Sequence, residues 1–415
     1  MPRPTADPLD TLLDNGLRIV AASMPGRATV SAHLRWPLGT VGDPADAQGV
    51  AVILHEWLQR GAGDLDAHAY ADAFDRLGAR RGGGVGREQA TLGVACLARD
   101  AAHALPLLAS AVAAPRLEDG EFEGARQLAL QELAAAADSP GERLLEAAMA
   151  ARYVGEHGRG AYGVRAHLRR LDAAGVRAAA PSRLSPEGAV LALAGGADAE
   201  ALLEAAAGAF AGWRGHAAPV PTPRPRPRTR VHRGGHGGQT HVALLESAVP
   251  PRAAGWTEQA LAMTALAGAT AGRLWTVVRE ERGLAYDVGS AVHVIDGDAF
   301  RLTHAVTAPE RASEAIAVLL QELERSRGGL AAGELRRAQL LLRSSVVFES
   351  ETSGGRAARL ASDVVRFGHP RSVARIEAAI DGVTLAGVNA FLASRPAVDP
   401  TVVTTGPSPT GAWSA

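Results

Sequence analysis

Apolar and polar positions along this chain recur with two different periods. Residues 30–36 alternate between apolar and polar side chains and end at Pro37, which is typical of a half-buried strand. Residues 66–77 repeat their apolar side chains at helical spacing, and residues 90–97 form a further strand candidate. Strands and amphipathic helices are therefore expected to alternate along the first part of the chain.

The remaining elements of the first half follow from turn and helix signals. Asp14, Asn15 and Gly16 form a strong turn signal before a β-prone stretch, which predicts an opening hairpin. The turn-rich residues 39–49 precede an apolar stretch that we expect to be helical through about Arg60. Further helices are predicted at residues 100–112 and 119–137, and a strand at residues 189–194.

The composition changes sharply after Trp213. Prolines stand at every second position, namely Pro219, Pro221, Pro223, Pro225 and Pro227, and Arg224, Arg226 and Arg228 follow the last three of them. Proline has no backbone N–H and a fixed φ, so this stretch predicts an extended linker that packs neither as helix nor as sheet. The predicted division is an N-terminal half at 1–215, a linker at 216–235 and a C-terminal half at 236–415.

The second half repeats the first. The sequence that begins at Gly120 has an echo that begins at Gly333, 213 residues later. The helix predicted at residues 100–112 has its counterpart at residues 313–325 with the same offset. We infer two homologous α+β halves joined by the linker.

Composition and charge limit the classes of function. The 415 residues exceed one hydrophobic core, and 47% apolar residues indicate a globular protein. A net charge of −1 argues against nucleic acid or an anionic membrane surface as the main partner. All basic residues are arginine, which is typical of a GC-rich genome.

Targeting signals and cysteines give a second set of expectations. No stretch reaches the roughly 20 apolar residues of a membrane span, and the N-terminus lacks the apolar region of a cleavable leader. The single cysteine, Cys96, excludes an internal disulfide and lies in an apolar run, where a buried inert thiol is expected. We expect a cytoplasmic protein.

Three stretches of this sequence resemble one known family. Residues 11–17 are similar to its opening strand, Gly49, Val50 and Ala51 to the approach to its metal helix, and residues 272–286 to its second hallmark. The family is the pitrilysin/insulinase family of zinc peptidases, in particular the bacterial and mitochondrial-processing-peptidase type. The resemblance implies an α+β fold of two homologous α/β-sandwich halves, each a mixed or antiparallel sheet covered by helices, in a clamshell arrangement.

The resemblance also implies where the zinc motif lies in this sequence and which of its residues are replaced. The family carries H-x-x-E-H on a helix, with two histidine ligands, a glutamate base and a third ligand glutamate downstream. On this pattern Val52 replaces the first histidine, His55 the base and Glu56 the second histidine, whereas Glu132 retains the downstream position. The supporting acid seven residues before Glu132 is replaced by Ala125. On the family's substrate-pairing edge strand, Gly82 and Gly83 stand where Asn-Ala is usual.

The second hallmark is retained. Arg279 and Tyr286 match the arginine and tyrosine that in this family hydrogen-bond the substrate carbonyl near the zinc. Such donors orient the scissile peptide and stabilise the developing oxyanion. In two-chain members one subunit brings the zinc motif and the other brings this pair, and this sequence resembles the second kind.

Plainer readings of these residues remain open. His55 and Glu56 can be a polar pair at a helix edge, Arg279 a helix arginine in surface ion pairs, and Tyr286 a strand residue that closes the core. His232, His236 and His241 invite a metal interpretation, but their glycine-rich segment favours a solvated tether.

The leading prediction is a non-catalytic, substrate-binding subunit that forms a heterodimer with an H-x-x-E-H subunit and binds extended peptides. Zinc is expected in that partner and no cofactor in this chain. One alternative is a zinc peptidase with altered ligands from His55, Glu56 and Glu132. The other is a homodimer that binds peptides or serves a structural role.

Overall fold

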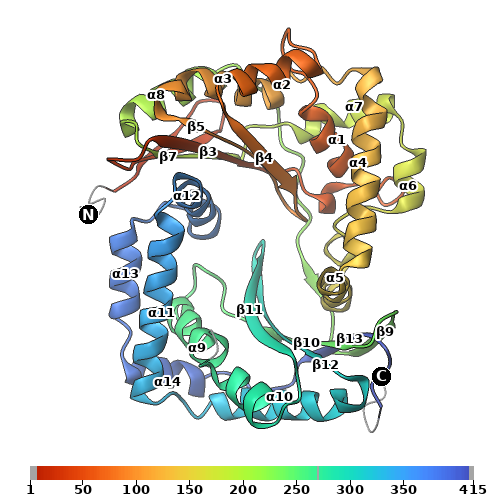
Figure 1. Ribbon diagram of the computed structural model, residues 1–415, viewed down its shortest axis with the longest axis vertical. Helices are drawn as coiled ribbons and strands as arrows, with labels where there is room; N and C mark the ends of the chain where they lie inside the picture. Colours follow the sequence, from red (N-terminus) through yellow and green to blue (C-terminus); the bar gives the residue numbers. More distant parts are fainter. Residues whose placement is uncertain (1–6, 269–270, 411–415) are drawn as a thin grey trace. The chain divides into compact units, whose positions relative to one another are not determined.

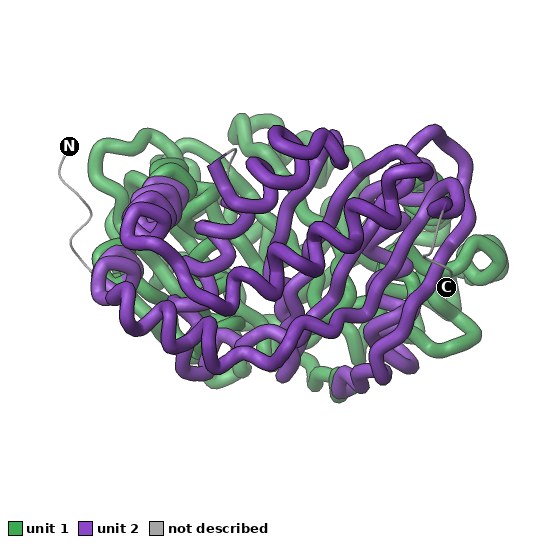
Figure 2. Tube along the Cα trace, turned by 90° about the horizontal axis from the view of Figure 1, so that it is seen from below, with its two compact units in different colours: residues 1–135, 160–221, 347–375 green, residues 136–159, 222–346, 376–415 purple. Residues whose placement is uncertain are grey.

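A computed structural model describes residues 7–268 and 271–410 of this protein, which form two compact units. Unit 1 contains the residues up to 135 together with 160–221 and 347–375, and unit 2 contains 136–159, 222–346 and 376–410. Each unit is built on one mixed β-sheet (Figure 1), and the two units are coloured separately in Figure 2. Residues 1–6, part of the N-terminus in which we expect no leader, lie outside the described residues.

The sheet of unit 1 has six strands, with the predicted hairpin at one edge. Strands β2 and β7 pair in parallel, and the other neighbours are antiparallel. The order across the sheet is β1 (Leu9–Leu12), β2 (Arg18–Ser23), β7 (Val190–Gly195), β3 (Thr29–Trp36), β5 (Ala90–Leu97) and β4 (Arg80–Val85).

Helices cover one face of this sheet with a continuous apolar core. Ile19, Leu34 and Leu191 point to this face and are fully buried among helical side chains. The helices that contribute to this core are α1 (Val50–Leu58), α2 (Ala67–Arg76), α3 (Ala101–Ala113), α4 (Asp119–Asp138), α6 (Arg165–Arg170), α7 (Ala173–Arg183) and α8 (Ala199–Phe210).

The opposite face of the same sheet is covered by one helix from the second half of the chain, α12 (Ser353–Phe367). Successive strand residues point to opposite faces, so Val20 and Ala192 lie on this second face, where they pack with Leu360. The hydroxyl oxygens of Ser31 and Ser353 lie 2.8 Å apart and join the sheet to the start of α12.

The sheet of unit 2 has five strands. Strands β9 and β13 pair in parallel, and the others are antiparallel. The order is β11 (Asp287–Ile295), β12 (Asp298–Thr307), β10 (Thr240–Ser247), β13 (Thr401–Gly406) and β9 (Arg230–Gly234). A separate two-stranded pair joins β6 (Tyr153–Val154) to β8 (Arg224–Pro225).

Both faces of this second sheet are also covered. On one face, Leu244 and Ala305 pack with α10 (Ala312–Ser326) and with a π-helical segment, Trp275–Glu281. On the other, Leu245 and Val403 pack with α5 (Pro140–Arg152), a helix from the first half of the chain. The remaining helices are α9 (Trp256–Ala267), α11 (Ala332–Ser350), α13 (Val373–Asp381) and α14 (Leu385–Ala393).

The two sheets have the same topology, which agrees with the repeat in the sequence. The order β2, β7, β3, β5, β4 has the same parallel and antiparallel pairings as β9, β13, β10, β12, β11. Helices α4 and α11 begin 213 residues apart, at Asp119 and Ala332, and α5 and α12 begin at Pro140 and Ser353 with the same offset. The equivalent helices α5 and α12 each pack on the sheet of the other half.

This exchange corrects the expected domain boundaries. The contiguous halves 1–215 and 236–415 are not the packing units, because residues 136–159 pack with the second sheet and residues 347–375 with the first. The linker at 216–235 also differs from the prediction. Within it, Arg224–Pro225 pairs with Tyr153–Val154, and its end, Arg230–Gly234, is a strand of the second sheet, where every residue has an N–H to donate.

Among the described residues, no single helix is long and apolar enough to cross a membrane. One bent pair, Val373–Asp381 with Leu385–Ala393, passes the same test of length and composition with a bend of 78°.

Because α5 and α12 each pack on the sheet of the other half, a mutation in either helix should destabilise that sheet. We expect Leu360→Ala to remove about 2–5 kcal/mol of stability because Leu360 is fully buried, and to speed amide hydrogen exchange in β2 and β7. The matched variant Leu144→Ala, on α5, should speed exchange in β10 and β13 instead. Leu340→Ala is the surface control, with an effect within about 0.5 kcal/mol. Faster amide hydrogen exchange in β10 and β13 for Leu360→Ala would contradict the packing of α12 on the sheet of unit 1.

Candidate functional site

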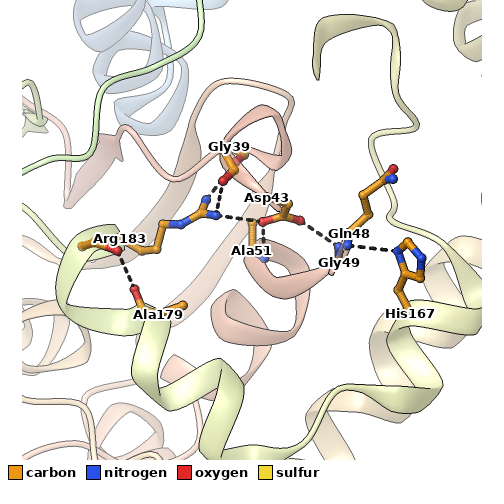
Figure 3. A network of polar contacts seen from close by, with 10 residues as sticks. Gly39, Asp43, Gln48, Gly49, Ala51, His167, Ala179 and Arg183 are labelled. Carbon is orange, nitrogen blue, oxygen red and sulfur yellow. Dashed lines mark hydrogen bonds and ion pairs between the residues drawn. The ribbon is translucent and has the colours of Figure 1, made fainter. Parts of the chain in front are cut away.

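Helix α1, which carries the altered zinc motif, is held at its start by a buried ion pair (Figure 3). The carboxylate of Asp43 accepts hydrogen bonds from the backbone N–H groups of Gly49 and Ala51, at 2.7 and 3.1 Å. Arg183, from α7, lies 3.2 Å from the same carboxylate and donates to the carbonyl oxygens of Gly39 and Gly42. Asp43 therefore satisfies N–H groups that the start of a helix leaves without a partner.

Burial disfavours the charged form of Asp43 and raises the pKa of its carboxyl. The hydrogen bond from the N–H of Gly49 and the charge of Arg183 oppose this rise. Gly49 itself precedes α1 with a φ of 113°, in the left-handed region. A side chain there would also collide with Leu168, because its Cβ would lie 2.4 Å from the Cδ2 atom. Glycine at this position is thus required by the turn and by the packing.

The three altered motif positions occupy very different environments. Val52 is buried in the core of unit 1 and offers no donor atom for a metal. The buried His55 ring donates from Nε2 to the carbonyl oxygen of Thr91 on β5, at 2.9 Å, and stacks on Trp36. Its other nitrogen, Nδ1, lies 3.5 Å from a carboxylate oxygen of the partly exposed Glu56. His55 thus links α1 to the sheet and is the polar residue of a packed core.

Glu132, the retained downstream position on α4, shares its electrostatic environment with this pair. Burial raises the pKa of the Glu132 carboxyl, the negative charge of Glu56 raises it further, and His55 lowers it. Glu132 is therefore close enough to His55 and Glu56 to interact with them electrostatically.

This donor set does not fit the zinc site of the family. Such a site needs about three converging ligands and one open position for water. Val52 contributes none, and the Nε2 atom of His55 is already hydrogen-bonded. Within residues 7–268 and 271–410, no group of three His, Cys, Asp or Glu side chains is placed to hold a metal ion.

The glycine-rich strand β4 is an edge of the first sheet, since β5 is its only strand neighbour among the described residues. Gly82 and Gly83 both lie on it, as expected for the substrate-pairing position. A Cβ on Gly83 would lie 2.1 Å from the carbonyl oxygen of Thr91, whereas Gly82 and Gly84 face open space. An edge strand presents unpaired backbone groups to which an extended peptide can add.

In unit 2, Arg279 lies between two aromatic rings. Its guanidinium carbon is 4.0 Å from the ring centroid of Trp275 and 5.1 Å from that of Tyr286. The Tyr286 side chain is 72% exposed, so it does not close the core. Among the described residues, no carboxylate forms an ion pair with Arg279. We call Trp275, Arg279 and Tyr286 the Arg279 cluster.

The cluster is built from a π-helical segment and the start of the edge strand β11. Trp275 and Arg279 belong to the segment Trp275–Glu281, and Tyr286 immediately precedes β11, with its N–H donating to the carbonyl of Val306. Cation–π contact restricts the guanidinium while leaving its N–H groups unpaired by carboxylates. Trp275 was not among the predicted site residues, although its position four residues before Arg279 is the available signal.

The remaining candidates have structural roles. His232 lies on β9 and not in a tether, with Nδ1 3.0 Å from the hydroxyl of Thr404, and His241 lies on β10. His236 lies between these strands. Cys96 is buried, as predicted, and burial raises the pKa of its thiol to about 11.

The fold is that of a two-unit α/β protein whose two mixed sheets share one topology. A family model described as insulinase, peptidase family M16, matches residues 18–161, and one described as peptidase M16 inactive domain matches residues 170–342. This chain belongs to the insulinase family, peptidase family M16.

Relatives and solved structures agree with this assignment. The chain is 30% identical over 397 residues to an uncharacterized zinc protease of Mycobacterium tuberculosis, covering 92% of this chain and 89% of that one. It is 28% identical to an uncharacterized zinc protease of Mycobacterium leprae, covering 92% and 87%. A crystal structure titled peptidase M16 inactive domain, from Pseudomonas fluorescens, has the same fold, with a TM-score of 0.87, 20% identity and coverage of 97% and 98%.

Restoring the motif tests whether the scaffold around α1 still suits a metal. We expect the triple variant Val52→His, His55→Glu, Glu56→His to retain about one zinc per chain, since positions 52 and 56 share a helix face and Glu132 lies nearby. Elemental analysis after dialysis measures the zinc content. Adding Glu132→Gln should lower it. A folded triple variant that retains no more zinc than the natural chain would contradict this expectation.

Proposed function

We propose that this chain is the non-catalytic, substrate-binding subunit of a heterodimeric zinc metallopeptidase that acts on peptides. The observation that carries the proposal is the contrast between two sites. Val52, at the position that the resemblance assigns to the first histidine ligand, is buried and has no donor atom, whereas Tyr286 is exposed beside Arg279.

The chemistry of the proposed partner follows from what this chain lacks. A peptidase of this class needs a metal-bound water and a carboxylate base to attack the peptide carbonyl. A subunit with an intact H-x-x-E-H motif would supply both. Relatives named zinc proteases support the existence of zinc-bearing members of similar length and sequence.

The contribution of this chain is the positioning of the substrate. Arg279 and the hydroxyl of Tyr286 are the donors for the carbonyl of an extended peptide, and the ring of Trp275 also contacts the guanidinium. Donors fixed before the reaction stabilise the developing oxyanion without the cost of reorganisation. The edge strand β4 offers a second place at which a peptide backbone can pair.

Reconstitution with the H-x-x-E-H subunit tests this role. Arg279→Ala and Tyr286→Phe should each lower kcat/KM about 100-fold, the usual cost of one lost oxyanion donor. Tyr286→Phe is the sharper variant because it keeps the ring beside Arg279 and removes only the hydroxyl. Arg282→Ala, an exposed arginine just after the same segment, is the matched control and should leave activity unchanged. Full activity of the Arg279→Ala, Tyr286→Phe double variant would overturn the proposal.

The rival enzyme, with His55, Glu56 and Glu132 as altered ligands, makes the opposite prediction for the isolated chain. We expect protein purified without chelator to contain far less than one zinc per chain and to cleave no peptide alone. Elemental analysis followed by peptide digestion measures both. Stoichiometric zinc together with cleavage, both abolished by Glu132→Gln, would establish the rival.

A further inference from the structure

Unit 2 contains a cavity that the proposed peptidase role does not use. Its volume is about 140 Å³, and it lies among the end of β10, helices α9, α10 and α14, and the segment that leads into β13. Apolar side chains form much of its wall, including Leu245, Met263, Leu323, Phe391, Pro396 and Val398. An apolar wall of this kind fits an apolar group of a ligand.

Arginines also line the same cavity, and four of the five form ion pairs. Glu246 and Asp399, in the lining, pair with Arg301 and Arg228, and Asp298 and Glu324, outside the lining, pair with Arg152 and Arg327. The lining arginines are Arg152, Arg228, Arg301, Arg327 and Arg395.

Arg395 is the arginine whose charge is least compensated. It donates to the backbone carbonyl of Ser247 at 3.0 Å, and among the described residues no carboxylate forms an ion pair with it. Burial and the neighbouring charge of Arg301 lower the pKa of its guanidinium, and Glu246 only partly opposes them. Arg301 and Arg395 thus share the carboxylate of Glu246, and a bound anion would offset the remaining positive charge of Arg395.

The size of the cavity limits the ligand. A cavity of about 150 Å³ accommodates a benzene molecule. A guanidinium binds a carboxylate through paired N–H donors. We propose that this cavity binds a small monoanion in which a carboxylate is joined to an apolar group of about the size of a benzene ring. The carboxylate pairs with Arg395, and the apolar group lies against Met263 and Phe391.

Benzoate and its neutral analogue benzamide test the proposal on the full-length chain. By isothermal titration calorimetry or NMR, benzoate should bind once per chain and at least about tenfold more tightly than benzamide, because only benzoate carries the charge. Equal binding of the two probes, or no saturable binding of benzoate, would overturn the proposal.

Two variants and one control locate the binding. Arg395→Gln should weaken benzoate binding at least about tenfold and leave benzamide unaffected. Ala262→Leu, on α9, should weaken both probes because it fills the cavity. Arg337→Gln makes the same change of charge on α11, outside the cavity, and should have no effect. Unchanged benzoate binding by a folded Arg395→Gln variant would refute the site.

The carboxylate can come from a free acid or from the last residue of a peptide. N-acetylphenylalanine and its C-terminal amide separate these sources. Binding of the acid as tightly as benzoate, with at least about tenfold weaker binding of the amide, would support a peptide C-terminus as the ligand. Binding of benzoate alone would support a free acid.

Discussion

The structure depends on the need to cover both faces of each β-sheet. In the first sheet, Ile19 points to one face and Val20 to the other, and both are fully buried. The helices of the same half cover only one of these faces. The second face is covered by α12 from the other half, and α5 does the same for the second sheet. Each unit therefore contains a segment of the other half, and we expect neither half to bury its sheet alone.

The residues that hold helix α1 in place differ from the residues that the resemblance assigns to metal chemistry. Asp43 and Arg183 fix the start of α1, and Gly49 supplies the left-handed turn before it. None of these three residues is among the positions that the resemblance assigns to the metal site. His55 contributes to the same scaffold, because its Nε2 atom joins the helix to the sheet through Thr91. Val52 and His55 are both buried in unit 1.

The second unit has the opposite character. The cluster of Arg279, Trp275 and Tyr286 lies at the surface beside an edge strand, and Tyr286 adds little to the core. An exposed tyrosine beside a guanidinium is available to a ligand. The cavity of the same unit is lined by five arginines, of which Arg395 forms no ion pair with a carboxylate among the described residues. Both sites have a donor chemistry suited to a carbonyl or carboxylate oxygen.

The sequence alone determined the local elements, the repeat and the family. Alternation placed β3 and β5, and the turn at Asn15 placed the first hairpin, because these signals depend on a few neighbouring residues. The sequence also identified Val52, His55 and Glu56 as the motif positions of the resemblance, since a motif is defined by the identity of its residues. Only the tertiary structure decided the exchange of α5 and α12, the strand at Arg230–Gly234 and the contact of Arg279 with Tyr286. These features join residues that are distant in the sequence or set by packing, and no local pattern specifies which apolar face a helix will cover.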